Sequence, residues 1–246
     1  MQASSDTLIL IPTYNNAGTV GDVVRRALAT GLPVLVVDDG STDGTDWRHT
    51  DAMVLRHAGN RGKGAALKTG FRKAKELGFS YVITLDADGQ HFPEDVDKLL
   101  VHKAPRTLVV GSRPQRGNSA GSRFANRFSN FWFRLYTWKN LPDTQTGYRL
   151  YPLESLPGLW LLGARYEAEL ALLVFSAWKG LRLVPATVQV SYPEDRVSHF
   201  RPVKDFLRIT VLNFLLLACA LFYGWPRMFF QSKKSVKIFL FSPKKQ

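Results

Sequence analysis

The apolar run Tyr81-Val82-Ile83-Thr84-Leu85 is followed directly by Asp86-Ala87-Asp88-Gly89-Gln90-His91. A short, largely apolar run of this kind predicts a buried strand, so two carboxylates stand where that strand ends. Hard cations such as Mg2+ and Mn2+ prefer oxygen ligands, commonly one or two carboxylates together with substrate phosphates. Asp86 and Asp88 are therefore candidate metal ligands, with the amide oxygen of Gln90 as a third. The alternative is a strand-ending turn with solvated carboxylates, because two aspartates one residue apart form a common pattern.

Strand and helix patterns alternate along the first half of the chain. Short apolar runs at 7–11, 33–37 and 107–110 predict further strands, and helical spacing predicts helices at 19–29, 64–77 and 93–101. Strands of this kind separated by helices indicate an α/β fold, with a mostly parallel sheet covered by helices on both faces. Ligands bind such sheets beyond the carboxyl ends of the strands. Those ends carry polar side chains of both charges, namely Asn15, Asp38, Asp39, Asp86, Asp88 and Arg113.

The length allows one large domain or a domain with a small appendage, and the composition describes a folded protein. Of the 246 residues, 45% are hydrophobic and 22% are charged, which is inconsistent with a disordered chain. The single Cys219 cannot form an internal disulfide and suits a reducing compartment. Met1 to Asp6 lacks the basic and apolar regions of a signal peptide. We therefore expect the chain to lie on the cytoplasmic side.

A basic and apolar tail follows the larger part of the chain. We expect a domain boundary between residues 1–201 and 202–246, because +7 of the net charge of +13 lies from Pro202 onward. These charges flank an apolar run from Val211 to Tyr223, which suits an anionic membrane surface. Nucleic acid is the weaker interpretation and is not expected as a partner, because the basic residues flank hydrophobic ones and do not interleave with aromatic residues on a polar face.

The apolar run of the tail is short for a membrane span, which needs about 20 residues. A single span would also carry the Lys-rich end out of the cytoplasm, against the positive-inside tendency. The sequence therefore favours an interfacial or re-entrant anchor, with 236–241 as a second insertion. A buried helix or an oligomer contact is the alternative.

Four ordered motifs resemble a known family. Ile11-Pro12-Thr13-Tyr14-Asn15, the segment 37–45, Asn60-Arg61-Gly62-Lys63-Gly64 and the segment 86–94 resemble those of inverting family 2 glycosyltransferases, which have the GT-A fold. Later segments at 111–113, 143–151 and 166–169 resemble the branch of dolichyl- and polyprenyl-phosphate sugar synthases of the mannose type. The resemblance covers roughly residues 7 to 200 and implies a Rossmann-like GT-A domain.

The resemblance implies a donor site. Its nucleotide-binding positions are Pro12, Tyr14, Asn15, Asp39 and Asp86, and its metal positions are Asp86, Asp88 and Gln90. A bound Mg2+ or Mn2+ would stabilise the charge that develops on the departing nucleoside diphosphate. Asp39 can accept a hydrogen bond from a base N–H of uracil or guanine, so the donor is a GDP- or UDP-hexose. An Asx turn is the alternative role for Asp39, and Asp38 could be a structural partner.

The catalytic positions implied are Asp88, Arg113, Asp143 and Arg149. The guanidinium groups of Arg113 and Arg149 fit phosphate oxygens, and surface salt bridges are their alternative. Asp143 is the first choice for a base if the acceptor is a hydroxyl, whereas a lipid phosphate needs none. Candidate acceptor-binding residues are Arg123, Glu167, Glu169, Arg196, His199 and Arg201. Glu167 and Glu169 could instead be an acidic pair favoured at a helix N-terminus.

The expected function is transfer of a hexose, with inversion, from a nucleotide sugar to a lipid-linked acceptor such as polyprenyl phosphate. The expected location is the cytoplasmic face of a membrane, with the tail as a peripheral, re-entrant or anchoring element. One alternative is the same fold acting on a hydroxyl of a glycolipid or surface polysaccharide. An alternative of another class is a membrane-bound protein that binds nucleotide sugars without turnover.

Overall fold

A mixed seven-stranded sheet forms the centre of the protein, in the order β3-β2-β1-β4-β6-β5-β7. The computed structural model describes residues 5–114, 120–158, 167–191 and 202–230. The strands are β1 (Thr7–Thr13), β2 (Val34–Asp38), β3 (Met53–Arg56), β4 (Tyr81–Thr84), β5 (Thr107–Ser112), β6 (Arg149–Pro152) and β7 (Arg182–Thr187). The α-helices are α1 (Ala17–Ala29), α2 (Lys63–Glu76), α3 (Val96–Leu100), α4 (Ala120–Thr137), α5 (Glu167–Trp178) and α6 (Pro202–Cys219). Short 3-10 turns lie at Pro93–Asp95 and Leu153–Ser155.

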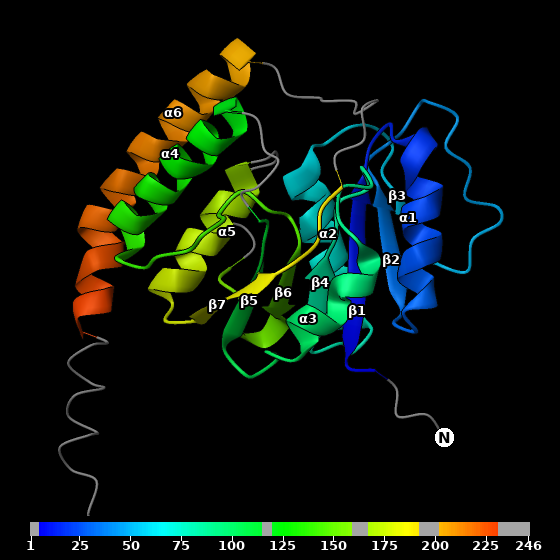
Figure 1. Cartoon of the computed structure of the whole chain (residues 1–246), viewed down its shortest axis with the longest axis horizontal. Helices are drawn as coiled ribbons and strands as arrows, with labels where there is room; N and C mark the ends of the chain where they lie inside the picture. Colours follow the sequence, from blue (N-terminus) through cyan, green and yellow to red (C-terminus); the bar gives the residue numbers. More distant parts are fainter. Residues whose placement is uncertain (1–4, 115–119, 159–166, 192–201, 231–246) are drawn as a thin grey trace, which may run out of the picture.

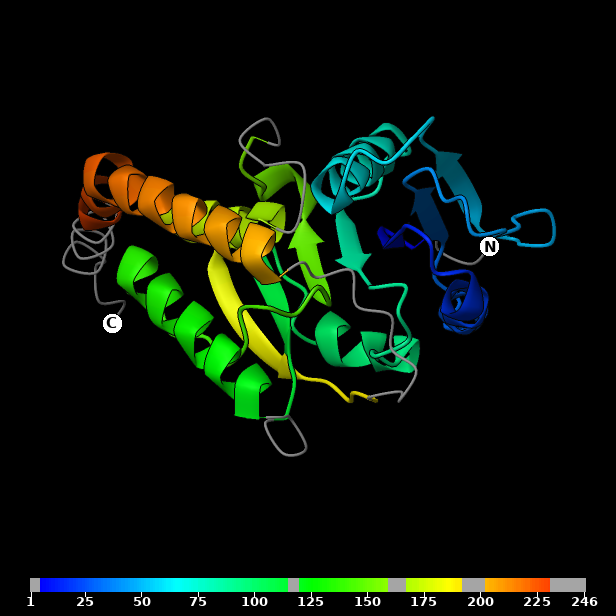
Figure 2. The same ribbon diagram turned by 90° about the horizontal axis from the view of Figure 1, so that it is seen from above.

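Helices cover both faces of the sheet, which explains why β1 and β2 are buried along their whole length. Along β1, Leu8 and Leu10 point into a core shared with α2, α4, α5 and α6, whereas Ile9 and Ile11 point into a core shared with α1 and α3. Successive side chains of a strand face opposite sides, so a strand covered on both faces has no polar side. Figures 1 and 2 show α1 and α3 on one side of the sheet and α2 on the other.

The sheet opens at the carboxyl end of β1. Parallel pairing between β1 and β4 ends at Leu10 and Thr84, and Pro12 stands two residues farther along β1. Proline has no N–H to donate, so it is tolerated where a strand has lost its neighbour. On its other side β1 stays paired with β2 as far as Thr13 and Asp38. Because the strand order reverses between β1 and β4, this opening is the switch point at which α/β sheets bind ligands.

The predicted α/β fold with a mostly parallel sheet is confirmed. The four predicted strands are β1, β2, β4 and β5, although the predicted helix at 93–101 divides into a 3-10 turn and α3. Patterns too short or too mixed to predict strands produced β3, β6 and β7, and the 18-residue α4 was not predicted. Of these strands, β6 is antiparallel to both of its neighbours, β4 and β5.

The first part of the tail packs against the main body of the protein. α6 continues through a π-helical turn at Ala220–Gly224, and Leu216 and Ala220 are buried in the core under α2, α4 and α5. The Tyr136 hydroxyl of α4 donates a hydrogen bond to the side chain of Asn213 in α6, at 3.0 Å. A Cβ at Gly224 would lie 2.3 Å from the Trp178 ring, so only glycine permits this approach. The boundary at 201/202 stays a prediction, and 236–241 lies outside the described residues.

Candidate active site

Charged side chains from four elements meet at the carboxyl edge of the sheet. Asp86 and Asp88 follow β4, Lys63 begins α2, Glu169 lies in the first turn of α5 and Arg113 follows β5. Gly147, two residues before β6, packs on Asp86, because a Cβ there would lie 2.6 Å from Asp86 Oδ2. The close approach of this backbone lets the 143–147 turn reach Asp86.

Lys63 lies between the Asp86 carboxylate and α5. Its Nζ lies 2.6 Å from Asp86 Oδ1 and 2.8 Å from Glu169 Oε2, and the Lys63 side chain is only 18% exposed. Burial opposes both charges, but the mutual attraction raises the pKa of Lys63 and lowers the pKa of Asp86 from their ordinary values. Both groups therefore stay ionised.

Two of the three residues expected to hold a metal are in contact. Asp88 accepts hydrogen bonds from the Gln90 backbone N–H at 3.0 Å and from Gln90 Nε2 at 2.7 Å, so the Gln90 amide nitrogen faces Asp88. No cluster of three or more His, Cys, Asp or Glu side chains with metal-binding geometry occurs in the described part of the chain. The donor set nevertheless fits a hard cation held by two carboxylates, with phosphate oxygens as further ligands. An ammonium already lies against Asp86, which shows that this carboxylate is compensated by positive charge.

His91 anchors the segment that carries the two aspartates. Its ring is buried against Tyr148, with ring centroids 5.3 Å apart, and burial lowers the pKa of His91 to about 4. The His91 side chain is therefore neutral at pH 7. Next to it, Gln90 accepts a backbone hydrogen bond from Ser191 at 2.8 Å. These contacts hold the segment after β4 against the start of β6 and the chain after β7.

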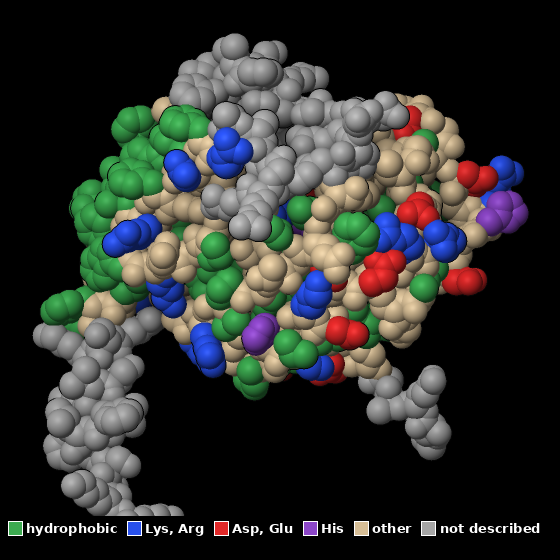
Figure 3. Space-filling view, viewed as in Figure 1, with side chains coloured by type: hydrophobic (Ala, Val, Ile, Leu, Met, Phe, Trp, Pro, Cys, Tyr) green, Lys and Arg blue, Asp and Glu red, His purple; other side chains and the backbone are tan. Residues whose placement is uncertain are grey.

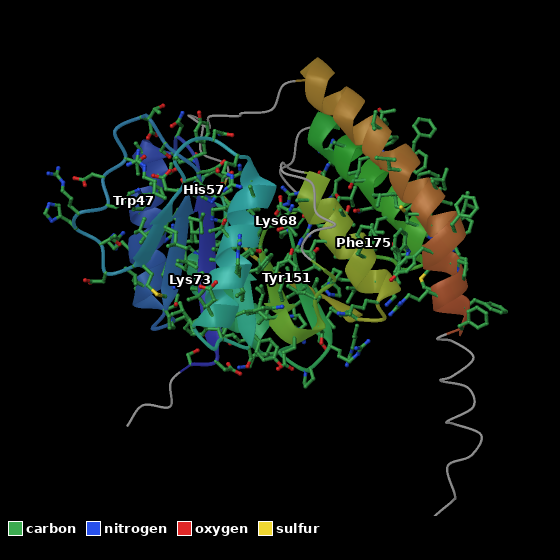
Figure 4. The ribbon with its side chains drawn as sticks, turned by 180° about the vertical axis from the view of Figure 1, so that it is seen from behind. Trp47, His57, Lys68, Lys73, Tyr151 and Phe175 are labelled. Carbon is green, nitrogen blue, oxygen red and sulfur yellow. The ribbon has the colours of Figure 1, made fainter. Side chains whose placement is uncertain are left out.

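Asp39 holds the loop before α2, and its expected contact with the nucleotide base stays a prediction. Its carboxylate is buried and accepts hydrogen bonds from the N–H groups of Arg61 and Gly62 at 3.0 and 2.6 Å. His57 Nδ1 lies 2.6 Å from the same carboxylate, and His57 Nε2 lies 3.0 Å from the Thr69 hydroxyl. This network fixes the start of α2, and with it the position of Lys63. Figure 4 shows His57 beside the strands at the same end of the sheet as Trp47.

Asp38 and Asn15 connect the loops that follow β1 and β2. Asp38 accepts hydrogen bonds from the Ser41 N–H at 2.8 Å and from Trp47 Nε1 at 2.9 Å, as a structural partner would. Asn15 has a φ of +53°, and its side-chain oxygen accepts the Thr42 N–H at 2.8 Å. Pro12 is buried and Tyr14 is half-buried beside them. Their nucleotide-binding roles stay predictions.

Arg113 and Asp143 form a bidentate ion pair. Arg113 Nε lies 2.6 Å from Asp143 Oδ2, and a terminal nitrogen lies 3.1 Å from Oδ1. Asp143 is fully buried, whereas the Arg113 side chain keeps 17% of its surface exposed. A carboxylate engaged in this way orients a guanidinium, and it is poorly placed to remove a proton from a hydroxyl acceptor.

Arg149 lies beneath the site and does not present its guanidinium at the surface. It is fully buried and donates hydrogen bonds to the backbone oxygens of Thr144 and Glu169, at 2.9 and 2.8 Å. The expected contact with substrate phosphate conflicts with this burial. The observed bonds tie the 143–147 turn to the first turn of α5, which is a positioning role.

The candidate acceptor residues are only partly described. Arg123 is exposed on α4, and Glu169 belongs to the Lys63 ion pair. Glu167 begins α5, while Arg196, His199 and Arg201 lie outside the described residues. Lys63 was not predicted as a site residue, although it stands in the motif Asn60-Arg61-Gly62-Lys63-Gly64. A lysine between two glycines at a predicted helix start was the available signal.

Known proteins share sequence similarity with this chain. The family model described as Glycosyl transferase family 2 matches residues 8–156, more than half of the chain. The chain is 36% identical over 164 residues to an undecaprenyl-phosphate mannosyltransferase of Micrococcus luteus, covering 61% of this chain and 67% of that protein. It is 26% identical over 238 residues to a UDP-N-acetylglucosamine–dolichyl-phosphate N-acetylglucosaminyltransferase of Methanococcus voltae, covering 83% and 95%.

A solved structure shares the fold. Glucosyl-3-phosphoglycerate synthase from Mycobacterium tuberculosis, in complex with Mn2+, uridine diphosphate and phosphoglyceric acid, superposes with a TM-score of 0.62 at 20% identity. The match covers 87% of this chain and 78% of that chain. At this identity the likeness establishes the GT-A type of architecture.

Proposed function

Because the chain belongs to glycosyl transferase family 2, we propose that it transfers a hexose from a nucleotide sugar to a polyprenyl phosphate, with inversion at the anomeric carbon. The observation that carries this proposal is the meeting of Asp86, Asp88, Lys63 and Arg113 at the switch point of the sheet. Carboxylates and cations placed there suit a diphosphate leaving group with its metal ion and an anionic acceptor. Two relatives, with lipid-phosphate acceptors in their names, support the acceptor class.

The proposed reaction is a single displacement. An acceptor phosphate oxygen forms a bond to the sugar C1 while the bond from C1 to the diphosphate oxygen breaks, and the nucleoside diphosphate leaves with the electron pair. Asp86 and Asp88 would hold a divalent cation, with Gln90 as a third candidate; when bound, that cation stabilises the charge on the diphosphate. Arg113, oriented by Asp143, would hold the acceptor phosphate.

The ion pair of Asp143 favours a phosphate acceptor over a hydroxyl acceptor. A hydroxyl must lose its proton to a base, and Asp143, the first choice for that base, is buried and paired with Arg113. A phosphate monoester is already ionised at neutral pH, so a site without a base can use it. Two alternatives are tested against this proposal. One is transfer to a hydroxyl acceptor, and the other is binding of the nucleotide sugar without turnover.

A donor panel tests the proposed function. The full chain in detergent, with Mn2+ and a short polyprenyl phosphate, is offered GDP-mannose, UDP-glucose and UDP-N-acetylglucosamine. We expect one donor to yield nucleoside diphosphate and glycosylated lipid phosphate in equal amounts. Donor binding without nucleoside diphosphate release would instead indicate a non-catalytic protein. Product formed only on an added hydroxyl acceptor would overturn the lipid-phosphate assignment.

An apolar and basic face of the protein supports a membrane location for this reaction. Phe214 and Phe222 in the α6 region are 69% and 85% exposed, and Phe124 on α4 is 72% exposed. Figure 3 shows hydrophobic side chains gathered along one edge of the molecule with Lys and Arg beside them, while Asp and Glu lie over the opposite half of this view. Apolar side chains flanked by positive charge suit an anionic lipid surface.

The helix of this face lies along the body of the protein. Thr210–Phe230, with 21 residues, is by length and composition the one helix in the described chain that could cross a membrane. The expectation that the apolar run is too short therefore needs correction, because the helix continues beyond Tyr223. Its buried Leu216 and Ala220, however, pack it beside α4 and α5. This packing supports a helix that lies in the membrane surface together with α4.

Negative charge introduced by mutation on this apolar face is expected to weaken binding of the protein to membranes. The variant Phe214→Glu/Phe222→Glu should bind vesicles of anionic lipid at least about tenfold more weakly, since each buried Phe contributes about 1.5–3 kcal/mol. Vesicle sedimentation measures the effect. Val101→Glu is the matched control, because Val101 is 76% exposed and directly follows α3, outside this face. Unchanged vesicle binding with a lower mass by light scattering would show that this face joins copies of the chain.

A further inference from the structure

The ammonium of Lys63 lies where a cation on Asp86 would have to bind. We propose that Lys63 is an internal counter-ion of the metal site: it neutralises Asp86 while the site holds no donor, and it leaves Asp86 when a divalent cation binds. This inference rests on the proposed function, because it concerns the cation expected at Asp86 and Asp88. It adds Lys63 to the residues that control the site, and it predicts how the binding of the cation depends on the binding of the donor.

The Lys63 ammonium and a divalent cation would occupy the same side of Asp86. Lys63 Nζ lies 2.6 Å from Asp86 Oδ1, within the contact distance of a charged hydrogen bond. A divalent cation bound to the same carboxylate would meet a positive charge at close range. Because like charges in a partly buried site repel strongly, the ammonium and the cation compete for Asp86.

Lys63 also forms an ion pair with Glu169, which it can keep when it leaves Asp86. Glu169 Oε2 lies 2.8 Å from Nζ, on the side of α5. One ammonium thus serves two carboxylates, and the nearby Asp143 is already neutralised by Arg113. A lysine that leaves Asp86 remains paired with Glu169, so displacement leaves no isolated buried charge.

The backbone at Lys63 and Glu169 is held by hydrogen bonds, whereas the Lys63 ammonium can move. Asp39 holds the N–H groups of Arg61 and Gly62 just before Lys63, and Arg149 holds the backbone oxygen of Glu169. The two ends of the bridge therefore keep their places. The ammonium is carried on a flexible four-carbon chain, so it can change partners without a change in the backbone.

Order of binding follows from this competition. In the absence of a nucleotide, a cation must displace Lys63 from Asp86 and gains only carboxylate ligands. A donor diphosphate supplies both additional ligands for the cation and a new anionic neighbour for the ammonium. Cation and donor therefore bind cooperatively, and by linkage each raises the affinity for the other by the same factor.

The test measures the binding of Mn2+ alone, in the full chain without donor or acceptor. Lys63→Gln removes the charge and keeps a hydrogen-bond donor. We expect it to bind Mn2+ about tenfold more tightly than the native protein in a calorimetric titration, since an opposing charge has been removed. Lys73→Gln is the matched control, because Lys73 is on the same helix and lies away from the site (Figure 4). Its Nζ also faces a carboxylate, with Glu76 Oε2 at 3.6 Å. This control should leave the Mn2+ affinity unchanged.

Thermal unfolding of the same variants gives a second measurement. Mn2+ should raise the Tm of Lys63→Gln by more than it raises that of the native protein, and a variant that folds only with Mn2+ would support the proposal equally. Equal or weaker Mn2+ binding, or a variant that Mn2+ neither binds nor stabilises, would overturn it. No sugar is transferred in these measurements, so a failed donor panel with tighter Mn2+ binding would reject the proposed function and leave the counter-ion intact.

Discussion

Replacing Asp88 by alanine is expected to lower kcat about a thousandfold, the scale seen when one preorganised group that stabilises transition-state charge is removed. Asp88 follows β4, and its carboxylate accepts hydrogen bonds from the backbone N–H and the side-chain Nε2 of Gln90. Its loss removes a candidate ligand of the cation. The measurement is nucleoside diphosphate release with the donor that the panel identifies, together with the amount of lipid-linked product.

Two further variants separate chemistry from folding in this experiment. Asp88→Asn keeps the shape of the side chain and can still accept the Gln90 N–H, so it should fold normally and show nearly the same loss of kcat. Asp97→Ala, at an exposed position on α3, should leave turnover unchanged. Native turnover by Asp88→Ala would refute the assignment of Asp88 to the metal site.

Replacing Arg149 by methionine is expected to destabilise the protein by about 3–5 kcal/mol, because a fully buried charged donor set is lost. The backbone oxygens of Thr144 and Glu169 would lose their partners inside the protein. For a chain of this size the corresponding fall in Tm is roughly 10 °C. Thermal unfolding followed by circular dichroism measures it.

The same variant decides between two roles for Arg149. A guanidinium that contacts substrate phosphate would, when removed, lower kcat/KM and leave Tm unchanged. A guanidinium that ties the 143–147 turn to α5 would lower Tm first. Arg182→Met, the same change at an exposed position in β7, should shift Tm by less than about 2 °C. If Arg149→Met melts at the native temperature, the positioning role is wrong.

The fold could be predicted because its signals are local. The apolar run before Asp86 predicts β4, and the polar residues after each strand predict which edge of the sheet carries the site. The confirmed strands are those with continuous apolar runs. α4 could have been found from the aromatic row Phe124, Phe128, Trp132 and Tyr136, four residues apart, but arginines and asparagines interrupt the pattern.

The roles of the charged residues could not be predicted in the same way, because they depend on contacts between distant segments. Asp39 meets the N–H groups of Arg61 and Gly62, and Arg149 meets the backbone of Glu169. Nothing in the sequence around an arginine or aspartate states whether it faces solvent, substrate or a buried carbonyl. The Lys63 bridge joins positions 63, 86 and 169, which only the folded chain brings together.

The reversed direction of β6 has a consequence for how this architecture can change. β5 ends and β6 begins at the same edge of the sheet, and the two strands are direct neighbours. Residues 113–148, which include Arg113, α4 and Asp143, therefore leave the sheet and return to it at one place. The entropic cost of closing such an excursion grows only slowly with its length. The part of this stretch that precedes the 143–147 turn can therefore be lengthened, shortened or exchanged while the registers of β1, β2 and β4 stay as they are.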